Sequence, residues 1–415
     1  MSTHRTLHLF EGFGIELEYM LVDTETLAVL PVSDHVLHAV AGEYASEVDM
    51  GEVAWSNELV LHVIEVKTNG PAPDLLGLPQ TFAAHLVHLN SLLAPLGGCL
   101  MPSAMHPWMT PHYETRLWPH EHNPVYEAFD RIFGCRGHGW ANLQSVHLNL
   151  PFADDAEFGR LHAAIRLLLP ILPALAASSP IVERQRTGFL DTRMEVYRTN
   201  AARIPRVTGD IIPEPVFTRR DYERHILQPL YQDITAYDPE AILQYEWLNA
   251  RGAIARFDRN TIEIRVLDVQ ECPLADLAIC AAIVTVLQTI MAERWSRLAE
   301  QQAWPTAPLR TILLETIRDA DQAVITNPQY LKSFGWPHRR HCTAGELWQH
   351  VLTATDLCSA LSPWAQPLQI MVQHGPLARR ILQALPDNFS PDHLQAVYRR
   401  LCMGLTSNTL FTGMD

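Results

Sequence analysis

Three segments of the chain alternate between apolar and polar positions with the period of a β-strand, and all three carry acids. They are residues 14–23 (GIELEYMLVD), 57–68 (NELVLHVIEVKT) and 261–268 (TIEIRVLD). Alternate side chains of a strand point to opposite faces, so each segment predicts a strand with one apolar face and carboxylates on the other. A buried carboxylate is usually paired or bound to a metal, because an isolated charge is costly in a low-dielectric site. Three such strands suggest a sheet lined with metal ligands.

The first and the last of these strands each place two charged side chains on one face. In the first strand, Glu16 and Glu18 share a face that is opposite an apolar one. In the last strand, the same reasoning puts Glu263 beside Arg265. An acid and a guanidinium on one face suit a cation and a phosphate together.

Two other runs add polar groups of the same kind. Glu58 and Glu65 are seven positions apart in the middle segment and would face opposite ways in an unbroken strand. A bulge or a bend is therefore required if both side chains reach one site. The run SVHLNL, residues 145–150, places Ser145, His147 and Asn149 on a polar face against three apolar residues.

The pattern of helices predicts the fold class. Strand-like runs alternate with helices up to about residue 270, and the rest of the chain is predicted to be helical. The predicted helices are residues 80–96, 155–177, 273–291, 308–323, 344–361 and 391–403. We therefore expect an α+β fold, with an open, mostly antiparallel sheet that forms a groove, helices on its outer face and a helical C-terminal third. We expect a catalytic region in residues 1–290 and a helical region in residues 291–415, packed as one domain.

Composition and charge exclude several classes of partner. The 415 residues are 47% hydrophobic and 19% charged, with a formal net charge of −15, and no stretch is rich in Lys and Arg. We therefore expect no nucleic acid or anionic membrane as partner, since both need clustered positive charge. The longest apolar run, residues 277–291, is short for a membrane span and is interpreted as a buried helix. The first 14 residues lack the pattern of a secretory signal, and the seven cysteines show no CxxC pair. These features predict a cytoplasmic protein with reduced thiols.

The polar faces together favour one chemistry over structural explanations. Each of these features, taken alone, has a structural explanation. An acid on a strand is typical of a solvated face, a single histidine such as His147 is usually structural, and Glu263 with Arg265 could form a surface ion pair. Four strands with such groups favour a common groove. Oxygen ligands with an occasional imidazole are typical of Mg²⁺ or Mn²⁺ sites, and several carboxylates around such ions can neutralise a polyphosphate. The chain has no GxxxxGK[ST] loop and no dinucleotide fingerprint, so metals would have to hold a nucleotide.

The order of these motifs resembles that of a known family. The chain is similar to the glutamate-cysteine ligase family, in particular its carboxylate-amine ligase branch, from GIELEYMLVD through NELVLHVIEVKT, SAMHPWMTP, SVHLNL and SSPIVERQRTGF to RMEVYR and FDRNTIEIRVLDVQ. The resemblance covers about residues 10–290. It implies a fold similar to the catalytic part of glutamine synthetase. It also implies an ATP-dependent ligase that forms a γ-glutamyl amide through an acyl phosphate, with ATP and Mg²⁺ or Mn²⁺ as cofactors.

The resemblance assigns a role to each candidate residue. It implies that Arg265, Glu263 and His147 are catalytic and that Arg265 contacts the transferring phosphoryl group. Asn149 and Arg265 would contact the nucleotide, and Arg193 and Arg198 would clamp the carboxylate of an amino-acid substrate through the fork geometry of arginine. The implied metal ligands are Glu16, Glu18, Glu58, Glu65, His147 and Glu263.

Other functions stay open from the sequence alone. The same carboxylates suit a metal-dependent amide hydrolase that activates water, or a nucleotide- and metal-binding relative without activity. The segment at residues 106–122 is rich in histidine and tryptophan, which is consistent with an acceptor pocket, a surface lid or a separate zinc site. We expect small-molecule amino-acid substrates as partners, with glutamate and cysteine as the default pair, and leave a homo-oligomer open.

Overall fold

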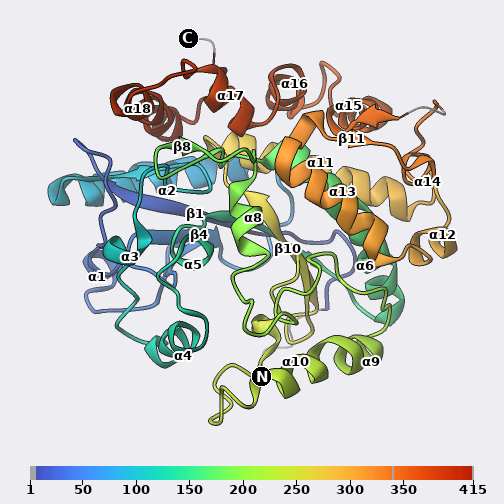
Figure 1. Cartoon of the computed structure of the whole chain (residues 1–415), viewed down its shortest axis with the longest axis horizontal. Helices are drawn as coiled ribbons and strands as arrows, with labels where there is room; N and C mark the ends of the chain where they lie inside the picture. Colours follow the sequence, from blue (N-terminus) through green and yellow to red (C-terminus); the bar gives the residue numbers. More distant parts are fainter. Residues whose placement is uncertain (1–5, 339–340, 414–415) are drawn as a thin grey trace.

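One eight-stranded antiparallel sheet forms the centre of the protein. The computed structural model describes residues 6–338 and 341–413, so the ends of both predicted regions, at residues 1–5 and 414–415, lie outside it. The strand order is β2-β3-β4-β1-β6-β10-β9, and β5 pairs with β1 beside this path. Figure 1 labels β1, β4 and β10 of this sheet near the centre of the molecule. The strands are β1 (Gly14–Asp23), β2 (Glu47–Asp49), β3 (Val53–Asn57), β4 (Val63–Thr68), β5 (Gly98–Met101), β6 (Ser145–Pro151), β9 (Ala253–Arg256) and β10 (Thr261–Asp268). This open sheet confirms the predicted fold class.

Strand β1 occupies the middle of the sheet and pairs with three other strands. Its whole central part pairs with β4, from Glu16 to Met20. On its other edge, the first half pairs with β6 and the second half with β5. Each of its two predicted faces therefore continues onto neighbouring strands: the apolar one becomes core, and the acidic one becomes the polar face of the sheet.

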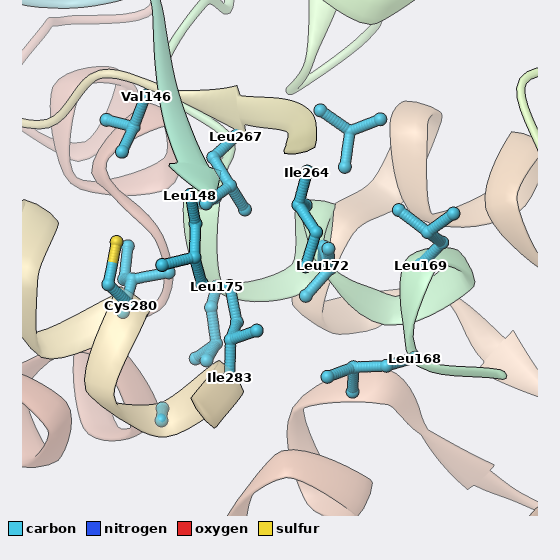
Figure 2. Packing of buried hydrophobic residues seen from close by; sticks show 14 of the residues in the cluster. Val146, Leu148, Leu168, Leu169, Leu172, Leu175, Ile264, Leu267, Cys280 and Ile283 are labelled. Carbon is cyan, nitrogen blue, oxygen red and sulfur yellow. The ribbon is translucent and has the colours of Figure 1, made fainter. Parts of the chain in front are cut away.

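Long helices cover the apolar face of the sheet. Helices α2 (Leu78–Leu93), α6 (Asp155–Leu168), α7 (Pro173–Ala176) and α11 (Pro273–Met291) contribute to the main core cluster. Figure 2 shows apolar residues of β6 and β10, among them Leu148 and Ile264, packed against leucines of residues 168–175 and against Ile283 of α11. Helix α6 begins after Asp154, whose carboxylate accepts from two backbone N–H groups. It ends before Pro170, because proline cannot continue the helix.

Helix α11 is apolar on all sides because it is enclosed by the protein. Among the described residues, it alone is long and apolar enough to span a membrane, and 83% of its apolar window is buried. It packs against α2 and α6, and also against α15 and α16 of the C-terminal region. A helix with this composition is typical of a protein core, as the sequence predicted.

The C-terminal region is helical, as predicted, and shares the main core. Figure 1 shows α15 to α18 together along one side of the molecule. Residues of this region, including Trp348 and Leu405, belong to the same buried cluster as Leu17 of β1. The division at residue 290 stays a prediction. The helices are α12 (Leu298–Gln302), α13 (Thr306–Asp319), α14 (Pro328–Lys332), α15 (Ala344–Ala354), α16 (Ala365–His374), α17 (Leu377–Gln383) and α18 (Pro391–Ser407), with strands β11 (Val324–Ile325) and β12 (Cys342–Thr343).

Shorter elements complete the fold. The helices among them are α1 (Ser33–Ala41), α3 (Pro111–Glu114), α4 (Asn123–Phe133), α5 (His138–Ala141), α8 (Thr192–Tyr197), α9 (Arg219–Tyr222) and α10 (Gln228–Ile234), and β7 (Ile181–Val182) pairs with β8 (Gln185–Arg186). Three of these helices, α4, α5 and α8, contribute side chains to the polar face of the sheet. Single turns lie at residues 94–96, 169–171, 223–227, 246–248 and 320–322. Apolar side chains of α4 and α10, such as Ile132 and Leu230, form a second core cluster. The seven cysteines are all free thiols.

Candidate active site

The acids of β1 meet the polar side chains of β6 across the strand pairing. Glu16 is directly opposite His147, and Glu16 Oε2 is 2.7 Å from His147 Nδ1. Asn149 donates from Nδ2 to Glu16 Oε1 at 3.0 Å. The second acid, Glu18, accepts from the backbone N–H of Ser145 at 2.7 Å and lies 3.7 Å from His147 Nε2. The polar faces predicted for residues 14–23 and 145–150 therefore form one surface.

Charge pairing shifts the pKa of both members of the central pair. Burial acts to lower the pKa of His147, but hydrogen bonding to Glu16 and the charges of Glu263, Glu16 and Glu18 raise it to about 9. Burial acts to raise the pKa of Glu16, but His147, Lys67 and Arg265 lower it to about 2. The pair is therefore an imidazolium with a carboxylate at neutral pH.

The strand expected at residues 57–68 is a hairpin, and the turn joins its two acids. β3 ends at Asn57 and β4 begins at Val63, so Glu58 lies at the start of the turn. Glu65 is on β4, opposite Glu18 of β1 and Ser56 of β3, and Ser56 Oγ donates to it at 2.9 Å. The chain reversal is the bend that the spacing of the two glutamates required. Burial and neighbouring carboxylates raise the pKa of both Glu58 and Glu65.

Strands β9 and β10 supply the basic side of the site. Glu263 and Arg265 share the polar face, and Arg265 Nε donates to Glu263 Oε1 at 2.9 Å. Glu263 is 3% exposed and lies 3.8 Å from His147. Arg256 of β9 approaches the other oxygen of Glu263 at 3.8 Å. Glu263 of β10 therefore lies between the acidic cluster around His147 and the guanidinium groups of Arg256 and Arg265.

These side chains line one cavity of about 380 Å³. Its lining includes the six residues predicted as metal ligands, together with Arg265 and Arg193. The full lining is Glu16, Glu18, Glu58, Leu59, Glu65, Lys67, Tyr126, Phe129, Trp140, Leu143, Ser145, His147, Arg193, Tyr197, Arg256, Arg259, Glu263 and Arg265. An adjoining cavity of about 550 Å³ shares Glu16, Lys67 and Arg259 with it and is lined by Asn149. The two cavities share these three side chains as walls, and we refer to them together as the groove.

The two arginines predicted to clamp a substrate are placed differently. Arg193 reaches the groove but is 2% exposed, and its guanidinium contacts Asp268 and three backbone carbonyls. Arg198 is outside the lining of both cavities and forms a double contact with Glu195 at 2.6 and 2.7 Å. The predicted clamp stays a prediction, and the structure brings only Arg193 to the site.

The groove also contains residues that the sequence patterns did not single out. Lys67 ion-pairs with Glu65 at 2.9 Å and with Glu47 at 2.8 Å, and these partners raise its pKa despite burial. The alternation of residues 57–68 could have placed Lys67 beside Glu65. Arg256 and Arg259 flank a turn with no periodic signal, and the aromatic side chains of the groove come from helices α4, α5 and α8. These distant contributions depend on tertiary structure.

The histidine-rich segment at residues 106–122 lies outside the groove lining. His106 is buried, with Nε2 2.8 Å from the carbonyl of Leu27, and Trp118 is also fully buried. Within residues 6–338 and 341–413, no three His, Cys, Asp or Glu side chains are arranged to hold a metal ion, either in this segment or in the groove. In the groove, ion pairs with Lys67, His147 and Arg265 occupy the carboxylates of Glu65, Glu16, Glu18 and Glu263.

Comparisons with other proteins identify the family of this chain. A family model described as Glutamate-cysteine ligase family 2 (GCS2) matches residues 12–397. An uncharacterized protein of Archaeoglobus fulgidus is 36% identical over 283 residues, which cover 68% of this chain and 75% of the relative. A protein of Salinispora tropica named "Putative glutamate–cysteine ligase 2" is 30% identical over 285 residues, 67% of this chain and 66% of the relative.

A solved structure shares the fold. The glutamate–cysteine ligase of Francisella tularensis, solved in complex with AMP, has a TM-score of 0.57 and 12% sequence identity, and the match covers 97% of this chain and 90% of that one. At this identity, the likeness concerns the fold, an α+β arrangement with an open antiparallel sheet. The family model spans nearly the whole chain, and this protein therefore belongs to glutamate-cysteine ligase family 2.

Proposed function

We propose that this protein is an ATP- and Mg²⁺-dependent carboxylate-amine ligase that forms an amide of the γ-glutamyl type through an acyl phosphate. One observation carries the proposal: five glutamates, one histidine and several arginines from different strands converge on one groove. Membership of the family supports it, and so do the names of the relatives. Glutamate and cysteine are the default substrates on the same grounds.

The reaction needs both kinds of charge that the groove contains. A carboxylate is a poor electrophile, so one of its oxygens first attacks the γ-phosphorus of ATP and ADP leaves. The amine nitrogen then attacks the acyl carbon, the bond to the phosphate breaks, and the nitrogen loses a proton. The first step brings two anions together, and positive groups aimed at the reacting atoms stabilise that arrangement. Arg265, Arg256 and Lys67 are the side chains that we propose for this role.

The donor chemistry of the groove fits Mg²⁺, although Glu16, Glu18, Glu65 and Glu263 already form ion pairs with basic side chains. Mg²⁺ prefers oxygen ligands, and carboxylates of Glu16, Glu18, Glu58, Glu65 and Glu263 are available with the imidazole of His147. We propose these residues as its ligands, with the bound ion neutralising charge on the phosphates. Loading requires the carboxylates to exchange their present partners, because no three of the described acids and histidines form a ready site.

The adjoining cavity suits the nucleotide. Its volume of about 550 Å³ is within the range of small-molecule sites, and it meets the acidic groove at Glu16, Lys67 and Arg259. Asn149 lines this cavity while donating to Glu16, so it is well placed to contact both a nucleotide and the acidic cluster. We propose a cytoplasmic location as well, supported by the seven free cysteines.

A phosphate-release screen tests the proposal. The protein is incubated with ATP, Mg²⁺ and pairs of amino acids, and products are identified by mass spectrometry. Hydroxylamine replaces the amine in parallel, since it converts an acyl phosphate to a hydroxamate whatever the natural amine is. We expect a hydroxamate with glutamate and an amide with at least one amine. Amide cleavage without ATP would indicate a hydrolase, and nucleotide binding without phosphate release would indicate a non-catalytic relative; either result rejects the ligase.

A further inference from the structure

Strand β10 contains a bulge at the position of Arg265. Its pairing with β6 runs from Glu263 opposite Asn149 to Ile264 opposite Leu148 and then resumes with Leu267 opposite Val146. Two residues, Arg265 and Val266, therefore face the single residue His147. A bulge of this kind bends the strand and re-aims the side chain at the irregularity. Arg265 shares the polar face with Glu263, so its side chain leaves the strand toward the groove at the point where the regular pairing with β6 ends.

Arg193 of α8 holds the backbone on both sides of this bulge. Its Nη2 donates to the carbonyls of Arg265 and Leu267, both at 2.9 Å. Its Nε donates to the carbonyl of Gln144, just before β6, at 3.3 Å. A broken ladder leaves carbonyl groups without their strand partner, and buried carbonyls need a donor. One guanidinium supplies donors to β10 and to the neighbouring segment at once.

The guanidinium is itself fixed by a buried polar frame. Nε of Arg193 lies 3.2 Å from Oδ1 of Asp268, and the other carboxylate oxygen accepts from Ser178 N–H and Ser179 Oγ, each at 2.8 Å. Ser179 Oγ also accepts from the backbone N–H of Arg193 at 3.0 Å. Asp191 caps α8 by accepting from Met194 N–H at 2.9 Å. Arg193 therefore has little freedom to turn toward a ligand.

We infer that Arg193 is a positioning residue: its guanidinium holds the carbonyls of the β10 bulge and thereby fixes the backbone from which Arg265 points into the groove. The inference rests on the proposed ligase function and gives Arg193 another role than the substrate clamp predicted from the sequence. Lysine cannot replace it fully, because its one nitrogen cannot reach the two bulge carbonyls and also make the contacts that Nε makes with the carbonyl of Gln144 and with Asp268.

The substitution Arg193→Lys tests the inference, with Arg166→Lys as the matched control. Arg166 is also fully buried and donates to the carbonyls of Pro213 and Trp304, outside the groove lining. We expect Arg193→Lys to lower kcat about tenfold to a hundredfold, as for a misplaced catalytic group, with KM for the carboxylate substrate nearly unchanged. Arg166→Lys is expected to lower thermal stability similarly and leave kcat unchanged.

Hydrogen–deuterium exchange of residues 261–268 gives a readout that needs no activity. Exchange in this segment is expected to rise in Arg193→Lys and not in Arg166→Lys. A rise in KM with unchanged kcat and unchanged exchange would show that Arg193 clamps substrate. Unchanged kinetics and exchange would show that the bulge is held without it. An inactive wild-type protein would reject the ligase proposal alone, since the exchange experiment still tests whether Arg193 holds the β10 bulge.

Discussion

At the scale of single residues, His162 of α6 shows how burial controls a charge. Its ring is stacked on Phe158 with centroids 5.3 Å apart and contacts Tyr222 at 5.8 Å. Burial, with a smaller effect from the charge of Arg166, lowers its pKa from 6.5 to about 3. The folded protein therefore keeps this histidine neutral through a pH range in which the unfolded chain takes up a proton.

The acid sensitivity of folding follows from that difference. Below pH 6.5, His162 binds a proton in the unfolded state but stays neutral in the folded state. The free energy of unfolding therefore falls as the pH drops toward 3. His162→Phe removes this contribution. When the pH is lowered from 8 to 5, we expect the free energy of unfolding to fall by about 2 kcal/mol less in the variant than in wild type. Urea unfolding at both pH values measures the change, with the exposed His35→Gln as control. Equal acid losses in His162→Phe and wild type would contradict it.

The acids of the groove predict a loss of activity in variants that stay folded. Glu16→Gln and Glu263→Gln keep side-chain volume but remove a charge that we assign to metal binding. We expect each to lower ATP turnover at least about a hundredfold with secondary structure retained, while the loss of the ion pairs with His147 and Arg265 lowers the melting temperature. The exposed Glu300→Gln on α12 is the control. Near-normal turnover in both groove variants would reject the metal-site assignment.

At the scale of elements, regular alternation was sufficient to predict the strands but not their irregularities. β1 and β10 have the bounds expected from sequence, since polar and apolar positions alternate through the first half of each strand. The hairpin in residues 57–68 was missed because the run LVLHVI looks continuously apolar and hides its turn. The bulge in β10 has a signal in retrospect: Val266 and Leu267 are adjacent and both buried, which breaks the alternation.

The same limit applies to the site. The acids and His147 could be predicted because each belongs to a periodic strand. The role that we infer for Arg193 could not be predicted, because its partners are backbone carbonyls more than 40 residues away in the chain. The aromatic side chains of the groove come from α4, α5 and α8, whose sequences carry no sign of which strand they face.

The close approach of β1 and β6 gives an element-scale prediction. Gly14 is opposite Asn149, and a Cβ at this glycine would lie 2.9 Å from Asn149 Cβ. Gly14→Ala must separate the strands slightly, and we expect it to cost about 1–3 kcal/mol of folding free energy and to weaken the Glu16–His147 pair. Gly77→Ala is the control, because a Cβ at Gly77 has nothing within 4 Å. Urea unfolding measures both, and equal stabilities would contradict the close contact.

At the scale of the whole molecule, the C-terminal helices and the sheet share one core. Arg380 of α17 is fully buried and pairs with Glu271, just after β10, and also donates to the carbonyl of Phe411. This arrangement ties the C-terminal segment to the strand that carries Arg265. One buried ion pair therefore connects the helical region to the edge of the site.

We expect the chain to unfold as a single cooperative unit. Glu271→Ala leaves the charge of Arg380 buried without a partner, and a loss of about 3–5 kcal/mol is expected for such a change. Hydrogen exchange in denaturant, read separately on peptides of β1 and α18, should show both losing protection together in wild type and variant. Early loss of α18 alone would show that residues 291–415 form a separate unit.

The balance of charge in the groove has a consequence for the kinetics of ligand capture. Five carboxylates line the cavity, together with five Lys and Arg side chains, Lys67, Arg193, Arg256, Arg259 and Arg265, and with the imidazolium of His147. The net charge of −15 is therefore carried by the rest of the molecule, which repels a polyanion at long range. Salt screens that repulsion over about 10 Å at 0.1 M ionic strength. The rate of association with ATP should consequently increase with moderate salt, whereas a protein that steers nucleotides electrostatically shows the opposite dependence.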